Sequence, residues 1–211
     1  MPAYVAKAML ISWTVIHFRT AFVQDGTEVR RVVKRLVLGI IFAALAAIPG
    51  HAALKVGAKA PDFSAQATLG GKEFKFLLAD ALKHGPVVLY FYPAAFTPGC
   101  TIEAHNFAEA VPAFKALGAS VIGVSRDNIK TLNKFSVEEC RSAFPVAADA
   151  TGEITKAYNA QLSSLLSISD RTSYVISPVG TIVYAYRALD PDHHVSNTLE
   201  AVKSWSKSQK K

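Results

Sequence analysis

Hydrophobic residues form runs and helical repeats that alternate along most of this chain. Residues 87–92 (VVLYFY) are continuously apolar, aromatic and β-branched between Gly-Pro and Pro boundaries, a pattern typical of a strand buried on both faces. Residues 101–117 carry apolar positions at three- and four-residue spacing, which predicts a helix that kinks at Pro112 and ends at Gly118. The two segments predict a central strand followed by a helix packed on it.

The rest of the chain continues this alternation and indicates the fold class. Further expected elements are a strand at 121–124, helices at 129–141 and 152–159, strands at 172–176 and 181–186, and a closing helix at 196–206. A βαβ unit followed by a ββα unit predicts an α/β protein with a thioredoxin-like fold, because right-handed crossovers leave few other arrangements. We therefore expect a central mixed β-sheet flanked by helices on both faces.

The composition fits one folded domain with an extension. The 211 residues are 51% hydrophobic and 18% charged, which provides ample apolar material for a core. Six of the 23 Lys and Arg residues and two of the 16 Asp and Glu residues precede Ala53, so most of the formal charge of +7 is N-terminal. Since the remaining charges nearly balance, we expect no nucleic-acid partner.

The N-terminal part has the pattern of a secretory signal. A basic cluster at 30–35 precedes the apolar run 36–48 (LVLGIIFAALAAI), which is shorter than the ~20 residues of a membrane-spanning helix. A Pro-Gly break follows, and the sequence GHA then places small residues at the two positions that a signal peptidase inspects. We expect cleavage between Ala52 and Ala53 and export of the mature chain to the periplasm.

This pattern divides the chain into two parts. Residues 1–52 form an extension with a signal-peptide-like segment at 30–52, and residues 53–211 form the thioredoxin-like domain. A secretory signal normally occupies about the first 15–30 residues of a chain, whereas the basic cluster here begins only at residue 30. An uncleaved membrane anchor and a cytoplasmic protein with an unprocessed leader are therefore the alternatives to export.

The loop after the first strand carries the candidate chemistry. It reads PAAFTPGC from Pro93 to Cys100, and it delivers the cysteine to the first turn of the next helix. Unpaired backbone N–H groups and the helix dipole favour an anion there, so the reactive thiolate is stabilised. The Thr97 hydroxyl is placed to hydrogen-bond the sulfur and an incoming oxygen, and Pro93, which has no N–H, can shield the sulfur from water.

These residues resemble the active-site signature of the peroxiredoxins, Pro-x-x-x-Thr-x-x-Cys. The resemblance extends over about residues 55–206, through GAKAPDF from Gly57, FTPGCT-x-EA from Phe96 and GVSRD from Gly123, and it is strongest to the bacterioferritin-comigratory, or PrxQ-like, branch. It implies a thiol-dependent peroxidase that reduces hydrogen peroxide and organic hydroperoxides through a cysteine sulfenic acid, an antioxidant function.

The resemblance also assigns roles to residues. It implies that Cys100 is the nucleophile, Thr97 a polarising donor, Pro93 the shield, and Arg171 the distant arginine that lies near the thiolate and polarises the peroxide. Taken singly, three of these residues have a structural alternative: Cys100 as a small buried hydrophobe, Thr97 as a helix cap, and Arg171 as a solvated residue at a strand end.

The second cysteine departs from the common pattern. Many PrxQ-like proteins place a resolving cysteine five residues after the first, where this chain has His105. Cys140 is the remaining candidate, in the expected helix 129–141, which supplies the resolving cysteine in another subset at a position near Ser136. Cys140 is therefore either the resolving cysteine of a disulfide with Cys100 or a packing residue on the apolar face of that helix.

Partners and rival functions follow from the same comparison. The resemblance implies a peroxide substrate, a thioredoxin or thioredoxin-like reductant, a monomer or weak homodimer, and no metal, flavin or haem. His193 and His194 are interpreted as part of a polar turn, and Glu103 as a residue that favours a helix N-terminus. The alternatives are a thioredoxin-like disulfide oxidoreductase, for which the chain lacks a C-x-x-C pair at Cys100, and a non-enzymatic holdase or binding protein.

Overall fold

The structure, a computed structural model, describes residues 52–163 and 166–210. The predicted signal-peptide-like segment lies outside these residues except for Ala52. No helix in the described part is both long and apolar enough to cross a membrane.

Seven strands form one mixed sheet in the order β2-β1-β5-β4-β3-β6-β7. The strands are β1 (Ser64–Leu69), β2 (Lys72–Leu77), β3 (Val87–Phe91), β4 (Ser120–Ser125), β5 (Val146–Ala148), β6 (Thr172–Ile176) and β7 (Ile182–Arg187). The helices are α3 (Leu78–Leu82), α4 (Pro98–Ala116), α5 (Ile129–Glu138), α6 (Glu153–Ala157) and α7 (His194–Ser208). The β3–β4 and β4–β5 pairs are parallel and the others antiparallel, which confirms the predicted α/β class and mixed sheet.

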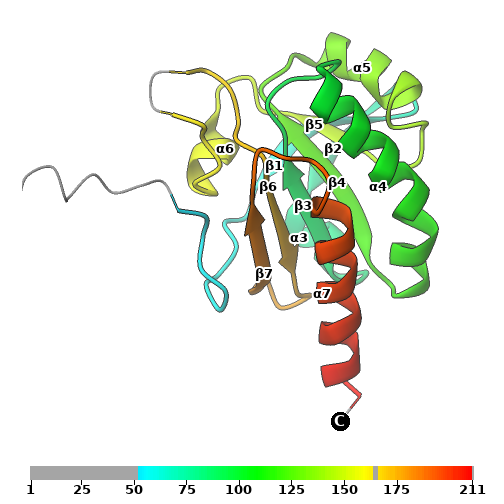
Figure 1. The fold of residues 1–211 in the computed structure, drawn as a ribbon, viewed down its shortest axis with the longest axis vertical. Helices are drawn as coiled ribbons and strands as arrows, with labels where there is room; N and C mark the ends of the chain where they lie inside the picture. Colours follow the sequence, from blue (N-terminus) through cyan, green and yellow to red (C-terminus); the bar gives the residue numbers. More distant parts are fainter. Residues whose placement is uncertain (1–51, 164–165, 211) are drawn as a thin grey trace, which may run out of the picture. The chain divides into compact units, whose positions relative to one another are not determined.

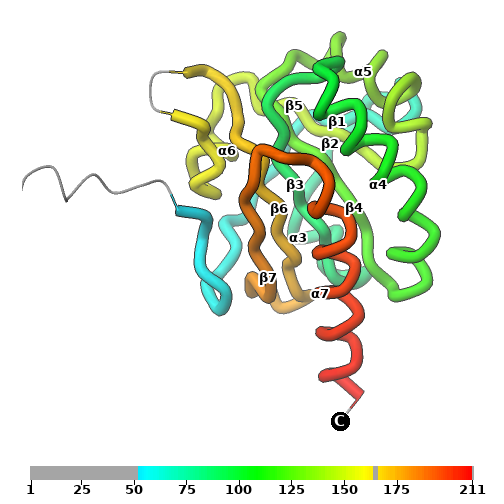
Figure 2. The backbone as a smooth tube through the Cα atoms, viewed as in Figure 1, coloured from blue at the N-terminus to red at the C-terminus, as the bar shows by residue number. Residues whose placement is uncertain are grey.

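Alternate residues of the central strand β3 enter two separate cores. Val88 and Tyr90 pack with α4, α5 and α7, whereas Leu89 and Phe91 belong to a second cluster that includes side chains of α3 and α6. Figures 1 and 2 show α4 and α7 side by side in front of the sheet, with α3 behind it. Helices therefore cover both faces, as predicted, and all of β3 is buried as its uninterrupted apolar sequence requires.

The central elements match the predicted segments closely, and the sheet edge adds elements that were not predicted. The antiparallel hairpin β1–β2 turns at Gly70 and Gly71, both with positive φ, a backbone region in which side chains with a Cβ are strained. Helix α4 begins three residues earlier than predicted and runs through Pro112 without ending. Proline is well suited to the first helical position, which is where Pro98 lies.

The end of α5 corrects one prediction. The helix was expected to extend over 129–141, but it ends at Glu138, and Arg141 and Ser142 adopt left-handed backbone conformations with φ of 51° and 54°. Cys140 therefore lies in the loop after α5 and does not share a helix face with Ser136. Its amide still donates to the Phe135 carbonyl at 3.0 Å, which ties the loop to the last turn of the helix.

Candidate active site around Cys100

The segment between β3 and α4 brings Cys100 to the third residue of a long helix. Thr97 is the residue before the helix, with extended backbone, and its carbonyl accepts the first helical hydrogen bond from Thr101 N at 2.9 Å. Cys100 is a free thiol and only 1% exposed. The sulfur therefore lies at the end of the helix where the dipole favours an anion, as the sequence predicted.

Two interactions define the shape of this active-site loop. The Ala95 amide donates to Asp127 Oδ2 at 2.8 Å, and the Ser125 hydroxyl donates to the same oxygen at 2.8 Å. Phe96 adopts a left-handed φ of 64°, which is costly for an aromatic residue, and its ring packs edge-on against Phe135 at 5.3 Å. The end of β4 and helix α5 thus hold a strained loop in one conformation.

Arg171 reaches the sulfur from the residue before β6. Its Nη2 donates to Cys100 Sγ at 3.6 Å, its Nη1 pairs with the Glu103 carboxylate, and its Nε donates to the Leu189 carbonyl at 2.8 Å. The guanidinium is almost completely buried. The predicted proximity of Arg171 to the thiol is therefore present in the structure, and it is fixed by contacts on two further segments.

Gly99 leaves space for this approach. A Cβ built at Gly99 would lie 3.0 Å from Arg171 Nη2, closer than ordinary van der Waals contact. The glycine of the PGC sequence therefore has a steric role beside the thiol.

The structure corrects the interpretation of Glu103 as a residue that only favours the helix N-terminus. It is completely buried, one turn after Cys100, and one of its carboxyl oxygens accepts a hydrogen bond from Arg171. Burial raises the pKa of this carboxyl group to about 8, although the positive charge of Arg171 opposes the rise. One of its oxygens, Oε1, is buried without a hydrogen-bond partner.

His194 was expected in a polar turn before the last helix and instead begins that helix, in the interior of the protein. It is the first residue of α7 and is completely buried, with Nδ1 2.7 Å from Ser173 Oγ and Nε2 2.9 Å from the Ala188 carbonyl. Its Nδ1 also lies 3.7 Å from Glu103 Oε1. The pair His193-His194 in the sequence gave no sign that one member would enter the core.

The other two residues predicted around Cys100, Thr97 and Pro93, lie in the segment between β3 and α4. The Thr97 hydroxyl donates to the Ala94 carbonyl at 2.9 Å, so its proton is not directed at Cys100. Its oxygen lone pairs can still accept a hydrogen bond. Pro93 follows Tyr92 directly and is half-buried at the start of the loop.

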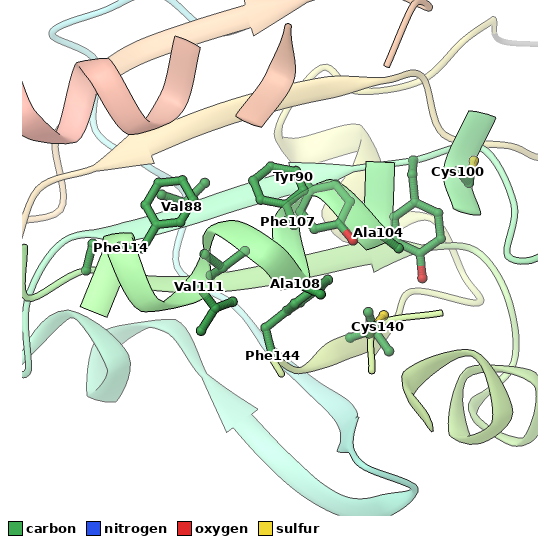
Figure 3. Close-up of a cluster of buried hydrophobic side chains, with 14 of the residues drawn as sticks. Val88, Tyr90, Cys100, Ala104, Phe107, Ala108, Val111, Phe114, Cys140 and Phe144 are labelled. Carbon is green, nitrogen blue, oxygen red and sulfur yellow. The ribbon is translucent and has the colours of Figure 1, made fainter. Parts of the chain in front are cut away.

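Cys140 is also buried, on a different segment from Cys100. Figure 3 shows both cysteines in the core cluster that contains Tyr90, Phe107 and Phe144, with no bond between them. Burial raises the pKa of the Cys140 thiol well above its usual range, so this thiol carries little thiolate in the folded state. His105 is partly exposed on α4, and its Nε2 pairs with Glu139 Oε2 at 2.8 Å, next to Cys140.

Within the described ranges, no three His, Cys, Asp or Glu side chains gather into a site that could hold an ion. The chemistry available at Cys100 is that of a buried thiol beside a permanent cation.

Comparison with known proteins identifies a family and relatives that this chain resembles. The AhpC/TSA family matches residues 56–185. Peroxiredoxin Q, chloroplastic, from Oryza sativa subsp. japonica is 31% identical over 149 residues, which cover 70% of this chain and 66% of the relative. Peroxiredoxin Bcp from Xanthomonas campestris pv. campestris is 34% identical over 127 residues, covering 57% of this chain and 78% of the relative. The chain thus spans just under two thirds of the rice protein.

A solved structure agrees with the sequence relatives. The crystal structure of peroxidoxin BcpB from Mycobacterium tuberculosis has a TM-score of 0.65 and 30% sequence identity, and the match covers 72% of this chain and 97% of that one.

Proposed function

The chain belongs to the AhpC/TSA family, in the branch of peroxiredoxin Q and Bcp, and from this premise we propose that it is a thiol-dependent peroxidase with Cys100 as nucleophile. The observation that carries the assignment is the 3.6 Å contact of Cys100 Sγ with Arg171 Nη2, at the first turn of α4. A guanidinium is permanently charged, so it stabilises the thiolate that attacks a peroxide. The family favours this function over a disulfide oxidoreductase and over a holdase.

The reaction proceeds by nucleophilic displacement at oxygen. The Cys100 thiolate attacks one oxygen of a hydroperoxide, the S–O bond forms as the O–O bond breaks, and the departing alkoxide or hydroxide takes a proton. The products are a cysteine sulfenic acid and an alcohol or water. Arg171 stabilises the charge that moves onto oxygen, as a preorganised donor does in an oxyanion site.

Thr97 and Pro93 act around the substrate. Because the Thr97 hydroxyl proton is directed to the Ala94 carbonyl, its free lone pairs accept a hydrogen bond from the peroxide O–H and so orient the substrate. This differs from the polarising donor expected from the sequence. Pro93 limits hydration at the start of the loop, since it offers no N–H to water.

Regeneration requires a second thiol. We propose that Cys140 attacks the sulfenic acid to form a disulfide and water, and that a thioredoxin-type protein then reduces the disulfide. Cys140 is fully buried, so the loop after α5 must open before the two sulfurs meet, and its two left-handed residues make that opening less costly. A one-cysteine cycle with an external thiol is the alternative.

Peroxide consumption by matched variants tests these assignments. Cys100→Ser is expected to abolish turnover, and Cys140→Ser to retain a single turnover of peroxide while losing the intramolecular disulfide. Peptide mapping without reductant, after one equivalent of peroxide, should identify a peptide that links the two cysteines. Wild-type turnover in Cys100→Ser would overturn the function, whereas unchanged multiple turnover in Cys140→Ser would support the one-cysteine cycle.

We also propose that the mature protein is exported and begins near Ala53, on the strength of the basic cluster at 30–35 and the apolar run 36–48. N-terminal sequencing of the native protein tests this. Recovery of a cytoplasmic chain that retains residues 36–48 would contradict it.

A monomer or weak homodimer is the assembly we propose. Large exposed hydrophobic side chains of the described residues are distributed over several loops and elements, among them Val56, Phe74, Ile102, Val137, Val179 and Leu189. Obligate dimers instead bury large, continuous apolar faces. Sedimentation equilibrium over a range of protein concentrations would measure the association.

A further inference from the structure

Arg171 contacts a second buried titratable group, Glu103, which the proposed reaction does not use. Arg171 contacts two acids, the Cys100 thiol and the Glu103 carboxyl group, and both are almost completely buried. A single guanidinium compensates one negative charge well, and a second buried anion is costly. Cys100 and Glu103 therefore compete for the same guanidinium.

His194 lies behind Glu103 and its protonation state can be assigned from its contacts. The Ala188 carbonyl, 2.9 Å from Nε2, can only accept a hydrogen bond, so Nε2 carries the proton. Burial lowers the pKa of His194 to about 4, so the ring is neutral at physiological pH. Nδ1 is then a lone-pair acceptor, directed at Ser173 Oγ and, at 3.7 Å, at Glu103 Oε1.

Glu103 Oε1 is the atom that could donate a proton to the Nδ1 acceptor of His194. It is buried without a hydrogen-bond partner, while the other oxygen of the same carboxyl group is held by Arg171. If Oε1 carries a proton, Nδ1 of His194 is an acceptor within a small movement of hydrogen-bond distance. If it does not, a buried carboxylate oxygen faces a lone pair.

We propose that Glu103 and His194 share one proton, resident on Glu103 Oε1, and that His194 is a positioning residue which holds the neutral carboxyl group so that Arg171 serves the Cys100 thiolate. The environments favour this placement of the proton, since burial raises the pKa of Glu103 to about 8 and lowers that of His194 to about 4. The proposal rests on Cys100 being the nucleophile, and it adds a residue of α7 to the support of the site.

Other groups face the pair from every packed element. These titratable or polar groups are Tyr90 on β3, Cys100 on α4, Arg171 and Ser173 at β6, Tyr186 on β7, Asp190 in the following loop, and His193 beside α7. Among the side chains of this group, Ser173 is the one that hydrogen-bonds Nδ1, so it competes with Glu103 for that lone pair.

The test measures the rate of Cys100 alkylation against pH, with the modified peptide assigned by mass spectrometry. We expect an inflection near pH 8 in the wild type, where Glu103 loses its proton. His194→Gln places its amide at the distance of Nε2 and loses the Nδ1 acceptor, so the inflection should move to lower pH. Alkylation at pH 7 should fall by up to about tenfold, the change that one pH unit represents.

Three matched variants separate positioning from general damage. His194→Asn retains an acceptor at the distance of Nδ1 and should keep the wild-type inflection. Ser173→Ala removes the competing donor, so its inflection should move to higher pH, and it decides the question if His194→Gln fails to fold. In a Glu103→Gln background, His194→Gln should produce no further change in the pH profile.

Identical profiles for the wild type and His194→Gln would overturn the proposal. So would His194→Asn behaving like His194→Gln, an unchanged or lowered inflection in Ser173→Ala, or an effect of His194→Gln that persists without Glu103. Alkylation involves no peroxide, so failure of the proposed peroxidase function would appear separately, as absence of peroxide consumption by the wild type.

Discussion

His105 Nε2 lies 2.8 Å from Glu139 Oε2, which joins the second turn of α4 to the residue before Cys140. The pair thus connects the helix that carries Cys100 to the loop that must open if Cys140 is to reach it. His105 occupies the position at which many PrxQ-like proteins have a resolving cysteine. In this chain the same position fastens the segment that carries the alternative cysteine.

We expect His105→Ala to increase the exposure of Cys140. A partly exposed contact between a polar side chain and a carboxylate contributes about 0.2–1 kcal/mol, so its removal should raise the population of the open loop by up to about fivefold. The measurement is the alkylation rate of Cys140 in a Cys100→Ser background. Lys83→Ala, which removes the exposed pair with Asp80 far from this loop in the sequence, is the control, and equal rates in the two variants would exclude a specific effect of His105.

Replacement of Arg171 should separate activity from stability. Arg171→Met removes the donor that faces Cys100 and is expected to reduce peroxide turnover by about 10²–10³-fold, as loss of a donor does in oxyanion sites. It also leaves the buried Glu103 carboxyl group without the donor that holds one of its oxygens, which should lower the free energy of unfolding. Addition of Glu103→Leu, which removes the unpaired polar group, should recover stability but not turnover, and recovery of both would mean that Arg171 has only a structural role.

Gly99→Ala should reduce peroxide turnover with little loss of stability. Alanine is favoured over glycine in helices by up to about 1 kcal/mol, which offsets the cost of the close contact, so the stability of the variant should stay near that of the wild type. Its Cβ, however, would lie 3.0 Å from Arg171 Nη2 and displace the guanidinium from Cys100. Thermal unfolding together with peroxide turnover would detect little-changed stability with reduced activity, and unaltered turnover would argue against the close approach.

Asp127 is expected to control the active-site loop from the end of β4. Asp127→Ala leaves the Ala95 amide and the Ser125 hydroxyl without their shared acceptor, a loss of about 1–3 kcal/mol for unsatisfied groups. The loop should then relax from the left-handed conformation at Phe96. Activity should fall more than for Asp190→Ala, an exposed acidic control, and equal activity in the two variants would contradict the anchoring role.

The sequence predicted the parts of this structure that local patterns determine. Long apolar runs identified β3 and β4, and the family signature identified Cys100 together with the approach of Arg171. The start of α4 was placed too late because Pro98 and Gly99 resemble a turn, although proline is also favoured at the first helical position. The first residue of a helix is set by the conformation of one backbone turn, which the pattern of apolar residues does not determine.

The roles of Glu103 and His194 depended on tertiary structure. Each residue occurs in a polar stretch of sequence, where exposure is the ordinary expectation, and each is completely buried because α4, β6 and α7 meet at that point. The end of α5 likewise differed because apolar residues continue past Glu138 while the backbone turns at Arg141 and Ser142. Periodicity alone did not reveal that turn.

The opposite pKa shifts of Glu103 and His194 predict a particular dependence of stability on pH. The pKa of Glu103 rises from 4.5 to about 8 on folding, so the native state keeps a proton that the unfolded chain loses, and stability falls as pH rises between those values. The pKa of His194 falls from 6.5 to about 4, so the unfolded chain binds the extra proton, and stability rises with pH between about 4 and 6.5.

These two contributions oppose each other between pH 4.5 and 6.5, and Glu103 alone acts from pH 6.5 to about 8. Urea unfolding at pH 6.5, 7.2 and 8 should therefore show the wild type losing stability relative to Glu103→Gln as the pH rises, because the variant has no proton to lose at this position. Glu109→Gln, an exposed substitution on the same helix, should follow the wild type throughout. Parallel stability curves for the wild type and Glu103→Gln would show that Glu103 is already ionised at neutral pH, and would remove the physical basis for a proton shared with His194.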